Sequence, residues 1–241
     1  MAINVEVIKV EDVMKYVKDD VKLMVGGFLG VGEPIKILDY IATQPVKNIH
    51  LVAVVGARVG GGFGIGKLTA NKQVASFLGS HIGTDPVLAK AYVDGSVKVE
   101  FNPMGTFIER IRAGGAGLGA VVTPTGLGTE VEEVAQRTNF YGKDYLVFEP
   151  VKADVAIIKA AKADMYGNLQ YDGTSINTNP TMATAAKIVI AEVDEIVEVG
   201  QIAPNDVGTP GIFVDYVVQG YSPEERKEQF GQYWEKMGWI K

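Results

Sequence analysis

Short apolar runs alternate with stretches of helical spacing along the whole chain. Residues 23–25 are a continuous apolar run, and residues 49–55 are apolar apart from His50. Both segments lead into glycine, which is typical of buried strands. Between them, Pro34 can occupy the first turn of a helix. The apolar face of that helix is then formed by Ile35, Ile37, Leu38 and Ile41.

The same reasoning predicts the remaining elements. Further helices are expected over 11–19, 69–75, 85–93, 106–113 and 223–237. Thr106 is the expected N-cap of the fourth of these. Further strands are expected at 76–82, 97–101, 120–122, 145–148, 155–158, 188–190 and 212–218. This alternation predicts an α/β fold, a mostly parallel sheet with helices on both faces. No linker or clear repeat interrupts the pattern, so residues 1–241 are expected to form a single domain.

Composition excludes several classes of protein. The 241 residues carry a net charge of −6 and no cysteine, so thiolate chemistry and disulfides are impossible. No apolar run approaches the roughly 18 residues of a membrane span, and no signal peptide is predicted. We therefore expect a cytoplasmic protein that binds neither membranes nor nucleic acid. His50 and His81 are expected to have structural roles, so no metal site is predicted.

Of the 29 glycines, 16 gather in four segments, at 26–32, 56–66, 114–119 and 126–128. Residues 61–67 match the phosphate-loop pattern G-x-x-x-x-G-K, but Leu68 stands where that motif needs Ser or Thr. Residues 115–120 match a dinucleotide fingerprint, but they follow a predicted helix and enter a strand, which is the wrong order. Neither nucleotide-binding motif is therefore complete.

The first and third glycine segments have two interpretations each. The turn at 26–34 joins a strand to a helix, so free N–H groups there could bind an anion or a developing oxyanion. The same glycines could equally serve a turn that needs positive φ. Gly114–Gly119 could let a long ligand lie against the backbone, or could permit tight packing.

These segments, in this order, resemble the family I CoA-transferases. The resemblance is specifically to the α subunits of the bacterial acetate, butyrate or acetoacetate enzymes and to the N-terminal half of succinyl-CoA:3-ketoacid CoA-transferase. One motif combines Asp19, the apolar residues 23–25, Gly26-Gly27-Phe28, Gly32 and Pro34. A second runs from Gly105-Thr106 through Glu109-Arg110 to Gly114-Gly115-Ala116-Gly117. The resemblance continues through Ala163-Asp164, Asn179-Pro180 and Thr209-Pro210-Gly211, so it covers nearly the whole chain.

The resemblance implies a CoA-transferase (NagB/RpiA-like) architecture and a covalent mechanism. A glutamate carboxylate attacks an acyl-CoA, which gives an anhydride and a CoA thiolate. The thiolate returns to the glutamyl carbonyl and releases the first acid, leaving a glutamyl-CoA thioester, and a second acid then reverses the sequence. The family places that glutamate in an S-E-N-G motif of its β half, and this chain contains no such motif. No catalytic residue is therefore assigned here. A β subunit is the expected partner, an α2β2 heterotetramer the expected assembly, and a CoA thioester the substrate, with no bound cofactor.

The same resemblance predicts one wall of a substrate or CoA site. Its expected residues are Gly26, Gly27, Phe28, Gly30, Gly32, Met104, Gly105, Gly114, Gly115, Ala116 and Gly117. The acids near these motifs, Glu33, Glu109, Glu130 and Glu132, are expected to be solvated or salt-bridged instead.

Two departures from the family bear on the acid substrate. Met104 replaces a usual glutamine, and residues 176–180 read Ile-Asn-Thr-Asn-Pro where the family often has R-N-F-N-P. Both changes could favour a larger or more apolar acid than acetate or succinate. The alternative function is a non-catalytic sugar-phosphate or metabolite-binding domain of the same architecture.

Overall fold

The computed structural model describes residues 4–240, and its centre is a nine-stranded sheet. The strands run in the order β1-β12-β11-β9-β2-β3-β4-β5, all pairs parallel, and β10 adds antiparallel to β9. Their bounds are β1 (Glu6–Ile8), β2 (Lys22–Val25), β3 (Ile49–Val52), β4 (Val74–Gly79), β5 (Lys98–Phe101), β9 (Ala153–Asp164), β10 (Leu169–Gln170), β11 (Ala186–Val197) and β12 (Tyr216–Gln219). The prediction of a mostly parallel sheet is confirmed.

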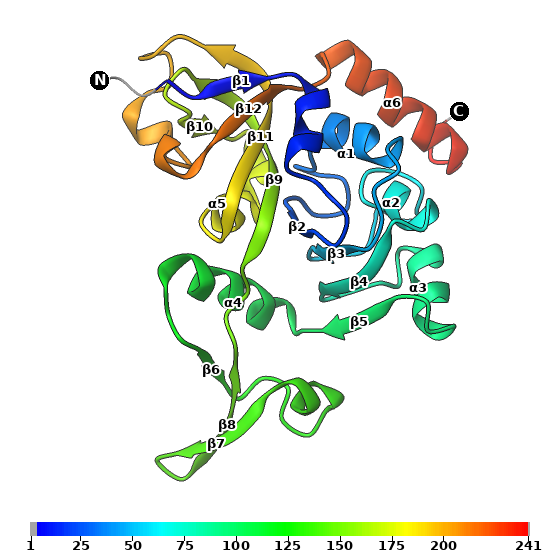
Figure 1. Ribbon diagram of the computed structural model, residues 1–241, viewed down its shortest axis with the longest axis vertical. Coiled ribbons are helices and arrows are strands. Elements are labelled where there is room, and N and C mark those ends of the chain that lie inside the picture. The colour runs from blue at the N-terminus through cyan, green and yellow to red at the C-terminus, as the bar shows by residue number, and fades with distance from the viewer. Residues whose placement is uncertain (1–3, 241) are drawn as a thin grey trace.

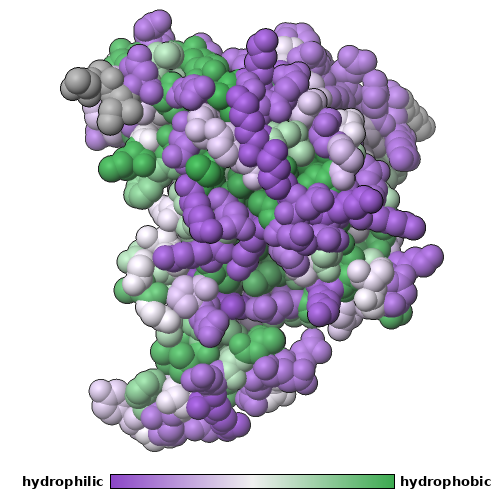
Figure 2. Space-filling view, in the orientation of Figure 1, coloured by the Kyte–Doolittle hydropathy of each residue, from purple (hydrophilic) through white to green (hydrophobic). Residues whose placement is uncertain are grey.

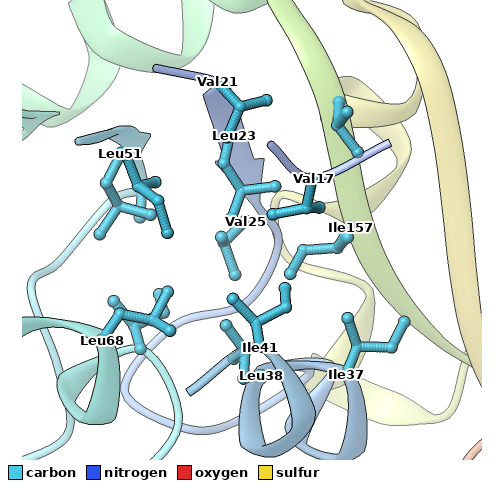
Figure 3. Packing of buried hydrophobic residues seen from close by; sticks show 14 of the residues in the cluster. Val17, Val21, Leu23, Val25, Ile37, Leu38, Ile41, Leu51, Leu68 and Ile157 are labelled. Atoms are coloured by element: carbon cyan, nitrogen blue, oxygen red, sulfur yellow. The ribbon is translucent and has the colours of Figure 1, made fainter. Parts of the chain in front are cut away.

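Both faces of this sheet are covered, as Figure 1 shows. One core contains η1 (Val10–Lys15), α1 (Ile35–Ala42), α2 (Gly66–Ala70) and α3 (Pro86–Val93), and the other contains α4 (Met104–Ala116) and α5 (Asn179–Ala183). Successive residues of a strand point to opposite faces. Leu23 and Val25 therefore enter the first core, while Met24 between them enters the second. Figure 3 shows the first core, in which Leu23 and Val25 face Ile37, Leu38 and Ile41 of α1.

A small antiparallel sheet lies below α4, with the order β6-β8-β7. It consists of β6 (Val121–Thr123), β7 (Gln136–Phe140) and β8 (Lys143–Phe148), and η2 (Glu130–Val134) precedes β7. Arg110 of α4 is buried where this sheet meets the large one. Its guanidinium donates to Glu100 at 2.5 Å, to Asn102 at 2.6 Å and to the carbonyl of Glu149 at 2.8 Å.

The chain ends in α6 (Pro223–Lys236), which begins with a capping box between Ser222 and Glu225. Tyr233 of this helix is 7% exposed and packs in a third cluster with Phe63 and Ile35. Phe230, Trp234 and Met237 pack against the same cluster. The prediction of a C-terminal helix with docked aromatic residues is therefore confirmed.

Several predicted boundaries are wrong. The helix expected over 11–19 is the 3-10 helix η1, the one expected over 69–75 is α2, and the strand expected at 76–82 begins at Val74. Thr106 is not an N-cap, because α4 begins at Met104 behind Pro103. The structure adds β1, β7, β10 and α5 and the 3-10 turns η2, η3 (Gly173–Ile176) and η4 (Pro204–Asp206), none of which the pattern indicated. The strand expected at 212–218 begins only at Tyr216, because η5 (Gly211–Phe213) precedes it.

None of the helices formed by residues 4–240 combines the length and the apolar character that crossing a membrane requires.

Candidate functional site

The turn after β2 is a closed hydrogen-bonded structure at the carboxyl edge of the sheet. The N–H of Gly26 donates to Ile157 O at 2.9 Å, and Phe28 and Val31 exchange a pair of backbone hydrogen bonds. The N–H of Gly27 donates to Thr178 Oγ1 at 3.2 Å. The N–H groups of residues 26–28 are thus already committed within the chain. A substrate contact by this turn therefore stays a prediction, and it would use the outer part, where Val31 is 43% exposed.

Three consecutive residues that lead into α5 fix this turn from the other side. Asn179 is fully buried, and its amide donates to Gly32 O at 3.1 Å while its oxygen accepts the N–H of Lys159 at 3.0 Å. Asn177 donates to Val31 O at 3.0 Å. A side chain at Gly26 would collide with the amide of Asn179, so this glycine is required for the close approach.

Glu33 closes the turn from inside the protein. Its side chain is 3% exposed, and its Oε1 accepts the N–H of Gly30 at 2.7 Å. Among residues 4–240 Glu33 forms no ion pair. The expectation that it is solvated or salt-bridged is therefore wrong. Glu109 and Glu132 do pair with arginines, and Glu130 is exposed, as expected.

A second glycine-rich segment, the loop formed by residues 56–66, follows β3 at the same edge. Ile65 N–H donates to Glu33 Oε2 at 3.4 Å, so this loop touches the turn through Glu33. Lys67 pairs with Asp39 at 2.5 Å, and the buried Leu68 belongs to the core. The phosphate-loop interpretation is thus not supported, because its lysine has an internal partner and its helix, α2, is one turn long.

A cavity of about 300 Å³ adjoins both glycine segments. Its lining includes charged groups from six elements or loops, namely Glu33, Arg58, Lys159, Asp172, Glu192, Asp194 and Arg226. Lys159 and Arg226 bind the two oxygens of Asp194, at 2.6 and 2.8 Å. Burial raises the pKa of Glu33 and of Glu192 to about 7, and it lowers the pKa of Lys159.

The aromatic side chains of α6 close the outer side of this region. The guanidinium of Arg58 lies within 5.8 Å of the ring centres of Phe230, Tyr233, Trp234 and Trp239. The hydroxyl of Tyr233 donates to Val59 O. Cation–π contacts of this kind hold the loop of residues 56–66 beneath the helix.

The second predicted segment lies on and beside α4. Met104 is 49% exposed at the start of the helix, and Gly105 beside it has open space at its Cβ position. Gly105 lines a hollow of about 660 Å³ between α4 and β6. Figure 2 shows hydrophobic surface at this junction between the large body and the small sheet.

Gly114 and Gly115 pack against the chain. A Cβ at Gly114 would collide with Val151 O, and one at Gly115 with the side chain of Thr184. Gly117 adopts φ 70° as the left-handed C-cap of α4, and Ala116 is exposed before it. The glycines that matched the dinucleotide fingerprint therefore end a helix, and no helix N-terminus faces a pyrophosphate here.

The structure does not bring all predicted residues to one place. The turn of residues 26–32 and Met104 follow β2 and β5 at the carboxyl edge, three strand spacings or roughly 14 Å apart. Gly114 and Gly115 lie near Val151 and Thr184, which precede β9 and β11 at the amino edge. A substrate role for this last segment stays a prediction.

Sequence reasoning missed Thr178, which accepts a hydrogen bond from the turn, and Lys159 and Glu192, which line the cavity beside it. It considered Glu33 but did not predict that this side chain is buried against the turn. A weak signal existed for Asn179, because Asn179-Pro180 belongs to the motifs that carry the resemblance. Among residues 4–240, no group of three or more His, Asp or Glu side chains is arranged to hold a metal ion.

Comparison with known proteins agrees with this architecture. The family model described as Coenzyme A transferase matches residues 7–220. The acetoacetyl-CoA:acetate/butyrate CoA transferase α subunit of Clostridium acetobutylicum is 39% identical over 90% of this chain and 98% of its own length. The acetate CoA-transferase subunit alpha of Escherichia coli is 40% identical over 86% and 94%.

Solved structures show the same fold at lower identity. An acyl-CoA transferase from Escherichia coli O157:H7 superposes with a TM-score of 0.81 at 24% identity, over 90% of this chain and 47% of its own. This chain thus spans about half the length of that protein. Glutaconate coenzyme A-transferase from Acidaminococcus fermentans gives a TM-score of 0.76 at 20% identity, over 96% and 88%.

The extent of the family match and the identity to full-length relatives lead to one conclusion: the chain belongs to the coenzyme A transferase family, and it matches members named as α subunits.

Proposed function

We propose that this chain is the α subunit of an enzyme that moves CoA between a short-chain acyl-CoA and a free carboxylic acid. Acetate, butyrate and acetoacetate are the proposed acids, in keeping with the names of its relatives. The nucleophilic glutamate is supplied by a β subunit, and the assembly is an α2β2 heterotetramer in the cytoplasm. The observation that carries the proposal is family membership over residues 7–220 in a chain without an S-E-N-G motif.

The geometry of the turn at residues 26–32 supports a role in one wall of the active site. Glu33, Thr178 and Asn179 hold it in place, so its outer part is a preformed surface at the edge where open α/β sheets bind ligands. A preformed surface needs no reorganisation when charge develops on the acyl oxygen, which favours catalysis. The chain's contribution is thus to orient the acyl group and to exclude water, while the partner's carboxylate forms and breaks the covalent bonds.

The departures in the sequence concern the acid. Met104 is half exposed and offers a weak acceptor where the family often has glutamine, and Ile176 is 42% exposed near the turn. Both favour acids with a longer alkyl chain. The alternative of a non-catalytic metabolite-binding domain has no specific observation in its favour.

The test is reconstitution. The chain is coexpressed with a candidate β subunit that carries S-E-N-G, and CoA transfer from acetoacetyl-CoA to acetate and to butyrate is measured for each chain alone and for the mixture. We expect a stable complex whose mass fits two copies of each chain. We also expect CoA transfer only in the mixture and in neither chain by itself. Mass spectrometry should detect a glutamyl-CoA adduct on the β chain. Full-rate transfer by the isolated α chain, or a mixture without transfer, would contradict the proposal.

A further inference from the structure

Glu33 joins two glycine-rich segments that are far apart in sequence. One carboxylate oxygen accepts the N–H of Gly30 in the turn after β2, and the other accepts the N–H of Ile65 in the loop of residues 56–66. The two contacts span 3 and 32 residues of sequence. At 3% exposure the side chain is shielded from water, so these hydrogen bonds do not compete with solvent.

The glycines around Glu33 leave the space that its side chain fills. A Cβ at Gly27 would lie 2.5 Å from Glu33 Cγ, and a Cβ at Gly64 would collide with Glu33 Oε2. Both glycines also have positive φ, at 111° and 54°. The turn and the loop are therefore shaped around this one side chain, and a shift of the carboxyl group would move both segments.

The other charged groups near Glu33 leave it without an ionic partner. Those that line the shared cavity are Arg58, Lys159, Asp172, Glu192, Asp194 and Arg226. Lys159 and Arg226 bind Asp194, and Arg58 lies among the aromatic rings of α6. Burial raises the pKa of Glu33 to about 7, while its two backbone hydrogen bonds and Arg58 oppose the rise. Around neutral pH the group therefore exists in two forms, and the ionised form is the stronger acceptor for both N–H groups.

We propose that Glu33 is a positioning residue of the transferase site, whose ionised carboxylate sets the turn of residues 26–32 against the loop of residues 56–66. It does not touch the substrate. It acts through Gly30 and Ile65, and protonation loosens the wall that those segments form. The inference rests on the proposed function and adds to it a residue and a pH dependence that come from this chain.

The test compares Glu33→Gln with the wild type in the reconstituted complex, with the exposed Glu198→Gln as the matched control. Glutamine keeps the shape but has one acceptor oxygen instead of two, so one N–H loses its partner. We expect kcat to fall by about tenfold with a smaller change in KM. We also expect wild-type kcat to rise several-fold between pH 6 and 8. This rise should disappear in Glu33→Gln and persist in Glu198→Gln.

A second measurement on the isolated chain separates this inference from the proposed function. In amide hydrogen exchange, the protection factor of at least one of Gly30 and Ile65 should fall several-fold in Glu33→Gln. Those of both amides should fall in the wild type as the pH is lowered below 7. Protection of the Gly26 N–H, which Ile157 accepts, should stay unchanged. A wild-type complex without transfer would refute the proposed function, whereas Glu33→Gln with the wild-type kcat and pH profile, or with unchanged protection of both amides, would refute the positioning role.

Discussion

Individual buried carboxyl groups govern how this chain responds to pH. Glu192 on β11 is 1% exposed, and its Oε2 accepts the N–H of Ile37 at 3.0 Å in the first turn of α1. The N-cap of that helix, Pro34, supplies no side-chain hydrogen bond. Glu192 thus caps a helix from a position 155 residues away, a role that a sequence pattern based on neighbouring residues does not reveal.

Glu192 provides a test of pH-dependent stability. Burial raises its pKa from 4.5 to about 7, so the folded chain holds this proton more tightly than the unfolded chain. Its contribution to the free energy of unfolding is therefore greatest below pH 4.5 and declines until about pH 7, by up to about 1.4 kcal/mol per pH unit. We expect the free energy of unfolding of Glu192→Gln, measured by urea denaturation, to fall less steeply than that of the wild type between pH 5 and 7.5.

The control for this experiment is Glu195→Gln, an exposed residue of the same strand that pairs with Lys162 at 3.0 Å. It should leave the slope between pH 5 and 7.5 unchanged. An equal slope in the wild type and in Glu192→Gln would show that the proton of Glu192 does not contribute.

Among the elements, α4 shows how tertiary contacts override local preference. Its three glycines, at 105, 114 and 115, are poor helix formers, and sequence reasoning ended the helix at residue 113. The helix continues to Ala116 because Gly114 and Gly115 let it lie directly against Val151 and Thr184. β7 was missed for a related reason, since its residues are largely exposed and lack apolar alternation.

Two alanine substitutions in α4 distinguish a glycine required for close packing from one with open space around it. Gly114→Ala should lower the free energy of unfolding by about 2 kcal/mol or more, because the added methyl group collides with Val151 O. Gly105→Ala lies in the same helix with open space at this position, so it should gain up to about 1 kcal/mol. Chemical denaturation of both variants measures the difference. Equal stability of the two would rule out packing as the reason for Gly114.

The C-terminal helix α6 is an element that the family match does not include, since that match ends at residue 220. Ending the chain after Tyr221 would remove Phe230, Tyr233 and Trp234 from Phe63 and Arg58. We expect a loss of roughly 4 kcal/mol of stability from this apolar burial. We also expect rapid trypsin cleavage after Arg58, because the loop of residues 56–66 loses its cover.

Tyr233→Phe is the graded control for this truncation. It removes the hydrogen bond to Val59 O and keeps the ring in its cluster, so cleavage after Arg58 should speed up only modestly. If the truncated chain resisted trypsin as well as the intact one, the helix would not be what holds the loop.

At the scale of the whole molecule, the alternation of elements was sufficient to predict the fold class but not the order of strands. β1 pairs with β12, so Glu6 lies beside Tyr216, and no local signal links them. The long strands β9 and β11 were predicted from their apolar centres at 155–158 and 188–190, and their charged ends were missed. The missed parts carry Lys159 and Asp194, which line the cavity.

The same limit applies to the candidate site. Glycine spacing located the turn at residues 26–32 and the loop at 56–66, because positive φ angles and close contacts in these segments require glycine. The side chains that fix the turn from elsewhere in the chain are Asn177, Thr178 and Asn179 at the start of α5. They reach the glycines only because β9 pairs with β2 in the sheet. The single-domain prediction for residues 1–241 stays a prediction.

The cluster of aromatic rings around Arg58 has a practical consequence. The chain contains two tryptophans, Trp234 and Trp239, and both lie within 5.8 Å of the Arg58 guanidinium. Indole emission therefore reports on a single locality, the seam where the end of the polypeptide covers the loop beside the glycine turn. Motion there on assembly or turnover can be followed by native fluorescence, without attaching a dye.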